Sequence, residues 1–193
     1  MMATQRSDEE LARQFIAGDV SAFEQLVMRY SKPVYNFALN FLGDPDEADE
    51  AAQLTFVQIY QSLPRARLDA PLKPWIYQIV RNKCIDLWRA RKGVLSLSAR
   101  VEPAGDEEPD PQDVEPADPL PLPEELVERK DLQRILRNAI RALPLKYRTA
   151  ATLRYVNEFS FAEIARTMGV PENTAKTYFQ RAKAILRRKL RDI

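Results

Sequence analysis

The sequence predicts an all-α fold of two small helical domains, joined by an acidic, proline-rich and flexible linker. Apolar residues recur at helical spacing in both halves of the chain, and no segment shows the alternation of a half-buried strand. Between the halves, residues 102–125 contain 10 acidic residues and 7 prolines but no lysine or arginine. Such a segment cannot bury a core. We therefore expect domains at residues 1–95 and 126–193, with the linker at 96–125.

Capping boxes and turn residues mark the ends of the expected helices. In a capping box, a serine and a glutamate three residues later satisfy each other's free backbone donors. The three pairs are Ser7 with Glu10, Ser21 with Glu24, and Ser160 with Glu163. Glycine and proline are expected to stop helices at Gly18, Gly43 to Pro45, Pro64, Gly93, Pro144 and Gly169. These marks predict about four helices before residue 93 and four or five after residue 124.

The segment DEADEAAQLTFVQIYQ, residues 46–61, opens with acids and continues with apolar turns. Acids at the start of a helix interact favourably with its positive end, which is a sufficient reason for their presence. A carboxylate metal site would need a second cluster of acids to complete the cage, and the sequence offers none. Gln53, Phe56 and Gln58 lie close together on the expected helix, which favours a face that docks on another protein.

The segment RARLDAPLKPWIYQIVRNKCIDLWRARK, residues 65–92, combines aromatic and basic residues. Pro74 suits a first helical turn. A buried stripe is expected at Ile76, Val80, Cys84 and Leu87, with Arg81, Ile85, Arg89 and Lys92 near a different face. Aromatic rings interleaved with cations are typical of single-stranded nucleic-acid binding. The alternative, that both tryptophans are core residues, is favoured for Trp88 and stays open for Trp75.

The linker and the segments beside it differ sharply in charge. Residues 65–100 carry 9 basic and 2 acidic side chains, and residues 129–193 carry 16 and 5. Residues 101–128 carry 11 acids and no base. The prolines favour extended backbone and the like charges repel, so the linker is expected to be extended. Two basic surfaces on either side of it indicate a polyanion bound at two places.

The segment SFAEIARTMGVPENTAKTYFQRAKAILRRKL, residues 160–190, has helix-turn-helix spacing. Gly169 permits the tight turn, and a second helix is expected to begin near Pro171. Ala175, Phe179, Ala182 and Leu186 fall on one face of that helix. The exposed side chains, which could enter a major groove, are Asn173, Lys176, Thr177, Gln180 and Arg181. The alternative is an amphipathic helical hairpin with a solvated polar face.

Several classes of function are not supported by the composition. The sequence has no signal peptide and no run of 18 apolar residues, so we expect a cytoplasmic protein without a membrane span. With no histidine and a single cysteine, Cys84, the usual zinc sets are absent and no internal disulfide can form. Cys84 is expected to be buried. We expect no catalytic residue, metal or cofactor, and thus no enzyme.

Together the motifs resemble a bacterial RNA polymerase sigma factor of the extracytoplasmic function (ECF) subfamily of the sigma-70 family. The resemblance covers about residues 7–92 and 129–191. It rests on the order and spacing of GDVSAFEQLVMRY, DEADEAAQLTFVQIY, WIYQIVRNKCIDLWR, LPLKYR and FSFAEIARTMGVPENTAKTYFQRAK. The competing hypothesis is a stand-alone helix-turn-helix regulator, whose N-terminal lobe senses a ligand or forms dimers.

The resemblance implies a role for each segment. The first domain would correspond to sigma region 2 and the second to sigma region 4. The chain would bind core RNA polymerase at two places, the clamp helices of its largest subunit and its flap. The residues that would bind the clamp helices are Asp49, Glu50, Gln53 and Phe56. The minus-10 element would be recognised and melted by Arg65, Arg67, Lys73, Trp75, Arg81, Asn82, Lys83 and Arg89. The minus-35 element would be read by Asn173, Thr174, Lys176, Thr177, Tyr178, Gln180 and Arg181.

The resemblance also implies an anti-sigma protein as a partner, and two residues depart from the family pattern. Relatives commonly have glutamate at the position of Leu54, and arginine at that of Tyr178. In the family, the linker passes through the active-site cleft of the polymerase. An acidic linker could there mimic a nucleic-acid strand on a basic surface, and the alternative is a spacer that only sets reach.

Overall fold

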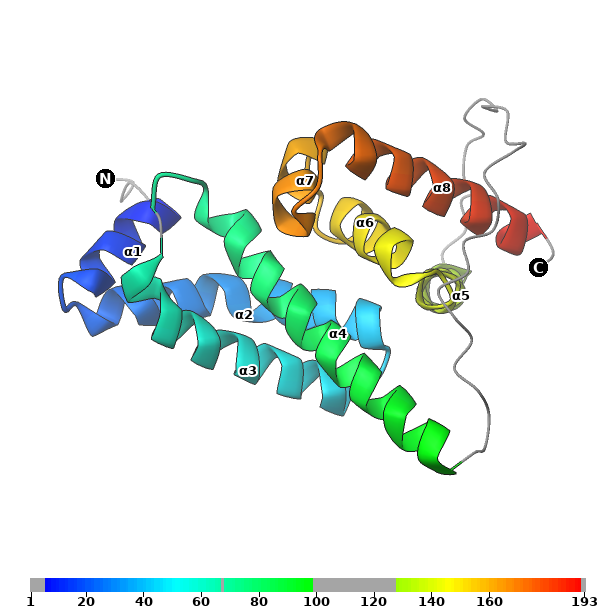
Figure 1. The fold of residues 1–193 in the computed structure, drawn as a ribbon, viewed down its shortest axis with the longest axis horizontal. Helices are drawn as coiled ribbons and strands as arrows, with labels where there is room; N and C mark the ends of the chain where they lie inside the picture. The colour runs from blue at the N-terminus through cyan, green and yellow to red at the C-terminus, as the bar shows by residue number, and fades with distance from the viewer. Residues whose placement is uncertain (1–5, 67, 99–127, 192–193) are drawn as a thin grey trace.

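A computed structural model describes residues 6–66, 68–98 and 128–191, and all of its regular elements are helical (Figure 1). Four α-helices precede the linker and four follow it, as the sequence predicts. The elements are α1 (Asp8–Ile16), α2 (Val20–Leu42), α3 (Pro45–Ser62), η1 (Leu63–Arg65), α4 (Leu72–Ser98), α5 (Glu128–Arg141), α6 (Leu145–Tyr155), α7 (Phe161–Met168) and α8 (Glu172–Arg191). We call α1–α4 the N-terminal lobe and α5–α8 the C-terminal lobe.

Helices α2, α3 and α4 pack along one another and form the body of the N-terminal lobe. Their buried sides meet around Phe37, whose ring centroid lies 5.7 Å from those of Phe41 and Tyr77. Helix α1 packs on α2, and the Glu9 carboxylate accepts a hydrogen bond from the Leu72 backbone N–H at 3.0 Å. Because the first N–H groups of a helix have no partner within it, Glu9 stabilises the start of α4 from another helix.

Two of the three predicted capping boxes are confirmed, at Ser7 and Ser160. The box at Ser21 is wrong, because α2 begins at Val20 and Asp19 is its N-cap. The Asp19 carboxylate accepts from the Ser21 backbone N–H at 3.0 Å and from the Ser21 hydroxyl at 2.7 Å. The Asp19 carboxylate, two residues before Ser21, caps α2 and also lies at the positive end of the helix dipole. Ser21 is therefore not needed as the cap.

The predicted stop at Gly93 is also wrong, because α4 continues to Ser98. A glycine inside a helix lowers the stability of the helix by only about 1 kcal/mol relative to alanine. A glycine alone therefore does not end a helix, and the helix ends there only where the backbone turns. Gly18, Gly43 and Gly169 do turn, with φ values of 103°, 82° and 67°. Residues 96–98, which the sequence assigned to the linker, belong to α4. Residues 99–125 lie outside the described residues, so the extended linker stays a prediction.

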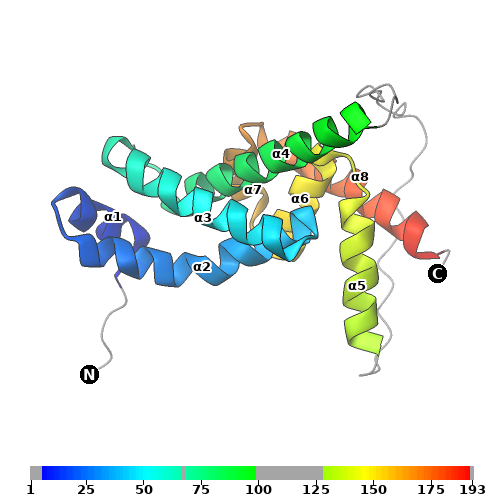
Figure 2. The same cartoon turned by 90° about the horizontal axis from the view of Figure 1, so that it is seen from below.

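The C-terminal lobe is built on α6 and α8, which pack side by side, with α7 and α5 beside them (Figure 1). Figure 2 shows α5 crossing the end of α2, with which it is in contact. A hydrophobic cluster holds this lobe together and consists of Ala139, Ile140, Leu143, Tyr147, Ala151, Ala182 and Leu186. None of the helices in the described part of the chain has the length and apolar character that crossing a membrane requires.

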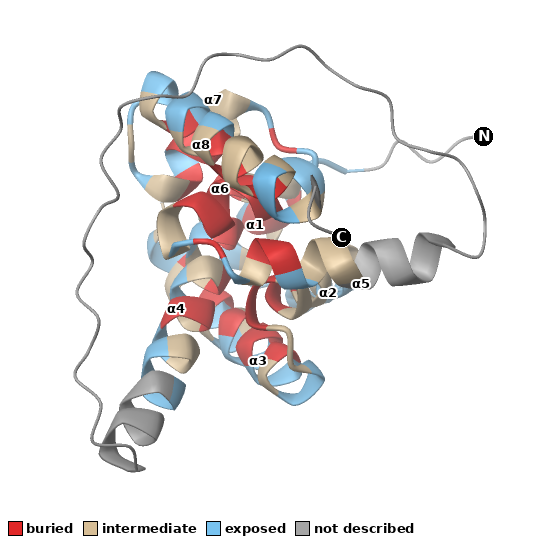
Figure 3. Ribbon diagram, turned by 90° about the vertical axis from the view of Figure 1, so that its right-hand side faces the viewer, coloured by how far each residue is buried: buried red, intermediate tan, exposed pale blue. Residues whose placement is uncertain are grey.

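The two lobes are packed against each other through a shared core, a contact that the sequence did not predict (Figure 3). Tyr77 on α4 meets Phe159, which precedes α7, with ring centroids 4.6 Å apart. The Asn157 amide donates to the Tyr77 hydroxyl at 2.8 Å. Burial raises the pKa of Tyr77 to about 12, although the hydrogen bond from Asn157 acts in the opposite direction. The larger hydrophobic core therefore contains residues from both lobes.

Candidate protein and nucleic-acid interfaces

The acidic face of α3 is exposed at the residues predicted to bind the polymerase. Asp44 caps this helix and accepts from the Asp46 and Glu47 backbone N–H groups at 2.9 and 3.0 Å. Asp49, Glu50 and Gln53 are exposed. The Gln53 amide donates to Asp49 at 2.9 Å, so two of these three side chains form one hydrogen-bonded unit. The face thus exposes two carboxylates and an amide at the surface of the protein.

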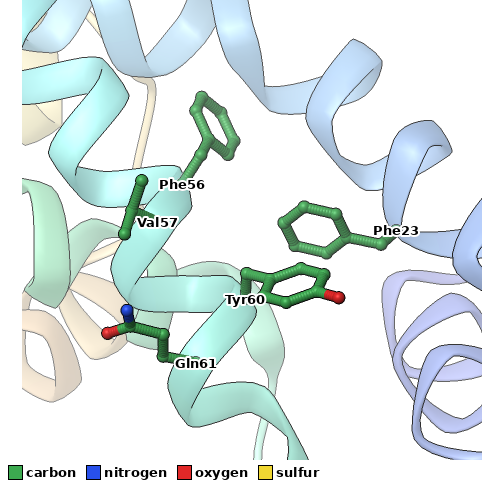
Figure 4. Close-up of a pocket in the computed structure, with 5 residues that line it drawn as sticks. All are labelled: Phe23, Phe56, Val57, Tyr60 and Gln61. Carbon is green, nitrogen blue, oxygen red and sulfur yellow. The ribbon is translucent and has the colours of Figure 1, made fainter.

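Phe56 is half-buried and lines an apolar hollow of about 290 Å³ beside that face (Figure 4). Phe23 from α2 and Val57, Tyr60 and Gln61 from α3 line it too. The Phe23 and Tyr60 ring centroids lie 5.2 Å apart. Val57 and Tyr60 are 53% and 50% exposed, and exposed apolar groups that gather in this way mark interaction sites.

Sequence reasoning missed four of the five residues around this hollow. A usable signal was present on α3, where Leu54, Val57 and Tyr60 recur every three residues and are all exposed. This repeat forms a second apolar stripe in addition to the buried one. No comparable signal marked Phe23, because it enters the hollow from another helix. The apolar hollow, defined by Phe23, Phe56, Val57, Tyr60 and Gln61, extends the predicted docking face.

The polar residues predicted to bind the minus-10 element differ in exposure. Arg65, Asn82 and Arg89 are exposed, whereas Lys83 is half-buried. The Arg81 guanidinium donates to Asn82 at 3.2 Å, and among the described residues its Nε meets no hydrogen-bond acceptor. Burial, followed by the charge of Arg89, lowers the pKa of Arg81. Arg67 lies outside the described residues.

Both tryptophans of α4 are half-buried and pack against the shared core. Trp88 also faces the guanidinium of Arg148 from α6, with 5.7 Å between the guanidinium carbon and the ring centroid, which favours the core interpretation. Cys84 is fully buried, as predicted, and burial raises the pKa of its thiol. Ile85, expected on a different face, is only 8% exposed. It is buried because α4 packs on α2, α3 and α7 and not on one neighbour alone.

Lys73 contacts the C-terminal lobe. Its ammonium lies 3.6 Å from the Glu163 carboxylate and 4.2 Å from the ring centroid of Phe159. Burial tends to raise the pKa of Glu163, but hydrogen bonds from Ser160 and the charge of Lys73 lower it below its ordinary value. The Glu163 carboxylate is therefore an anionic partner of Lys73 supplied by the other lobe.

The helix-turn-helix predicted for residues 160–190 is present as α7, the turn at Gly169, and α8. Ala175, Phe179, Ala182 and Leu186 are buried, as their spacing predicts. Among the predicted DNA-reading residues, the exposed ones are Asn173, Lys176, Thr177 and Gln180, and the half-buried ones are Thr174, Tyr178 and Arg181.

Two of these side chains already have partners within α8. The Thr177 hydroxyl donates to the Asn173 carbonyl at 2.9 Å, and Lys176 forms an ion pair with Glu172 at 2.9 Å. The predicted minus-35 residues thus share one helix in the C-terminal lobe. The minus-10 residues that the structure describes lie on α4 in the N-terminal lobe, except Arg65, which is the last residue of η1.

Known proteins match both lobes. Residues 26–94 match the family Sigma-70 region 2, and residues 133–186 match the family Sigma-70, region 4. The chain is 33% identical over 181 residues to the ECF RNA polymerase sigma factor SigW of Bacillus subtilis (strain 168), covering 94% of this chain and 95% of that protein. It is 28% identical over 196 residues to the RNA polymerase sigma-H factor of Pseudomonas aeruginosa, covering 100% of this chain and 98% of that one.

Two solved structures share the fold. CnrH, in complex with the cytosolic domain of CnrY, matches with a TM-score of 0.71 at 23% identity, over 97% of this chain and 99% of that one. The sigma factor RpoE of Bartonella quintana, in complex with the anti-sigma factor NepR, matches with a TM-score of 0.65 at 23% identity, over 88% of this chain and 96% of that one. From the match to SigW and to both sigma-70 regions, we conclude that the chain belongs to the ECF subfamily of the sigma-70 family and is an alternative sigma factor, which directs transcription initiation.

Proposed function

We propose that this sigma factor docks on core RNA polymerase through α3 and reads promoter DNA with α4 and α8. The observation that carries the proposal is the match to sigma-70 regions 2 and 4 in one chain, each falling on one lobe. The exposed polar faces of α3 and α8 support it. A stand-alone regulator would use α8 but would leave the acidic face of α3 and the basic residues of α4 without a role.

For the polymerase, the proposed contact is the clamp helices of its largest subunit. Asp49, Glu50 and Gln53 supply charge and hydrogen bonds, and Phe56 with the apolar hollow supplies apolar area. A polymerase helix with basic residues beside an apolar stripe would fit this surface of α3. Its basic residues would face the carboxylates, and its apolar stripe would face the apolar hollow. The C-terminal lobe would contact the flap, so that the two lobes are held at separate places on the enzyme.

For the minus-10 element, the proposed surface is the start and the exposed side of α4. Arg65, Arg67, Lys83 and Arg89 would neutralise phosphates of the separated strand, while Trp75 offers a ring on which a base can stack. The other residues of this set are Lys73, Arg81 and Asn82. Extruding a base from the duplex costs a few kcal/mol, so these contacts must offset that cost.

For the minus-35 element, the proposed reader is α8 in the major groove. Amide and cationic side chains distinguish base edges there, because each base pair presents its own pattern of donors and acceptors. Asn173, Lys176, Gln180 and Arg181 are side chains of this kind. Thr174, Thr177 and Tyr178 would add hydroxyl contacts to bases or phosphates.

We also propose that an anti-sigma protein regulates the chain, and the complex of RpoE with the anti-sigma factor NepR supports this proposal. Sigma factors are not enzymes in general, and we propose that this one contributes no catalytic side chain, metal or cofactor. The acidic residues of the linker would act as a mimic of a nucleic-acid strand inside the polymerase cleft.

In vitro transcription with purified bacterial core polymerase tests the proposed function. The reaction is run with and without the full chain, on a library of genomic promoter fragments, and the start sites are mapped. New start sites that require the chain would support the proposal and reveal both promoter elements. Tight sequence-specific duplex binding by the chain alone, without any initiation, would instead support the stand-alone regulator.

A further inference from the structure

Tyr147 on α6 contacts the DNA-reading helix α8 through its hydroxyl group. Arg181 donates a hydrogen bond from Nη1 to the Tyr147 hydroxyl oxygen at 3.2 Å. Tyr147 is buried in the hydrophobic cluster of the C-terminal lobe, together with Ala182 and Leu186 of α8. A buried ring keeps one orientation because its neighbours are close-packed. Its hydroxyl is therefore a fixed acceptor for the half-buried Arg181.

The ring of Tyr147 also supports Tyr178, the residue that stands where relatives often have arginine. The two ring centroids lie 5.9 Å apart and the rings are inclined at 66°. The Lys146 ammonium lies 5.4 Å from the Tyr147 ring centroid and 5.8 Å from that of Tyr178. A tyrosine has few rotatable bonds, so holding it in place costs little conformational entropy. Two rings and a cation from α6 and α8 thus form one packed group beside Arg181.

We propose that Tyr147 is a positioning residue for recognition of the minus-35 element, an inference that rests on the proposed function. Its hydroxyl fixes the direction of Arg181, and its ring supports Tyr178. Arginine loses much rotamer freedom when it binds DNA, and a side chain that is already oriented loses less. A guanidinium reads guanine only when it points at the base edge. One hydrogen bond to Tyr147 uses one of the five N–H donors of the guanidinium.

The test uses the full chain with core polymerase and two promoters that differ only in the minus-35 element, one intact and one scrambled. Tyr147→Phe removes the hydroxyl and keeps the ring. Tyr155→Phe makes the same change at an exposed position of the same helix and serves as the matched control. We expect Tyr147→Phe to lower transcription from the intact promoter by about three- to tenfold. Transcription from the scrambled promoter stays unchanged, which also shows that the variant folds and binds polymerase.

A double-mutant cycle separates positioning from a merely structural role. If Tyr147 acts through Arg181, then Tyr147→Phe has no further effect once Arg181→Ala is present. A library of minus-35 sequences gives a second readout, in which Tyr147→Phe relaxes the preference at one base pair and leaves the others unchanged. Three results would overturn the inference. Tyr147→Phe could lower transcription equally in the wild-type and Arg181→Ala backgrounds, it could lower transcription equally from the intact and scrambled promoters, or it could leave transcription at the wild-type level. If the wild-type chain supports no initiation at all, the proposed function fails and this inference with it.

Discussion

The guanidinium of Arg148, on α6, donates to the carbonyl oxygen of Phe41, the penultimate residue of α2, at 3.4 Å. The same group donates to the carbonyl oxygens of Arg141, the last residue of α5, and of Leu143 in the loop that follows. It also lies over the rings of Phe41 and Trp88. The last carbonyls of a helix have no partner within it and carry partial negative charge, so one buried cation satisfies groups from both lobes.

Replacing this cation is expected to loosen the contact between the lobes. Burial, followed by the charges of Arg141 and Arg91, lowers the pKa of Arg148 to about 10, so holding the charge there is already unfavourable. Arg148→Met keeps the apolar stem but leaves the carbonyls without a donor, which we expect to lower the free energy of unfolding by about 2 kcal/mol. Urea unfolding measures it. Arg166→Met, at an exposed position of α7, is the control, and equal stability of the two variants would contradict the prediction.

Removing the carboxylate beside Lys73 is expected to strengthen binding of single-stranded minus-10 DNA. Glu163→Gln keeps the capping box, since glutamine serves there as well, but removes the charge that attracts Lys73. Lys73 can then neutralise one more phosphate. The slope of log affinity against log salt should become steeper by about 0.7.

Fluorescence anisotropy of a labelled single-stranded oligonucleotide, titrated with the full chain at several salt concentrations, measures that slope. Glu172→Gln is the matched control, because it frees Lys176 on α8 and leaves α4 unchanged. We expect the control to keep the wild-type slope. A common slope for the wild type and both variants would show that the Glu163 carboxylate does not compete with phosphate.

Placing a charge in the apolar hollow is expected to weaken polymerase binding without unfolding the protein. Val57 is 53% exposed, so Val57→Asp should change the free energy of unfolding by less than about 1 kcal/mol. A carboxylate that becomes buried against an apolar partner loses its hydration, and we expect about a tenfold loss of affinity for core polymerase. Competition against a labelled sigma factor measures the affinity. Met28→Asp, at the more exposed Met28 of α2, is the control, and an equal loss there would sink the assignment.

Restoring the common residue at position 54 is expected to have the opposite effect. Leu54 is 39% exposed on α3, so Leu54→Glu should be tolerated, at the cost of a small repulsion from Glu50 one turn earlier. If the clamp presents a cation there, affinity for core polymerase should rise by about two- to fivefold. The same competition measures it at two salt concentrations, because a charge contact weakens as salt is added. An affinity that is unchanged, or lower at low salt, would count against a cation opposite Leu54.

The elements themselves were predictable because their signals are local. The serines at positions 7 and 160, the turn glycines and the apolar spacing of α8 each depend on residues within a few positions of one another. The errors at Ser21 and Gly93 are also local. In the first case Asp19 competes for the same role, and in the second the chain does not turn.

The contact between the lobes was not predictable, because it joins residues that are far apart in sequence. Tyr77 meets Asn157 and Phe159 across 80 residues or more, and nothing in the local pattern pairs them. The same holds for the position of Phe23 in the apolar hollow. The residues of the candidate site followed from motif positions in the family, but their partners, such as Glu163 for Lys73, required the structure.

The shared core also has a consequence for synthesis. A ribosome completes α4 at Ser98 well before it makes Phe159. At roughly 5–20 residues per second, the rest of the 193-residue chain takes about 5–20 s. During that time the side of Tyr77 that later meets Phe159 faces water or a chaperone. Each newly made molecule therefore passes through a stage in which its first half carries uncovered apolar surface. The acidic linker is translated during this stage.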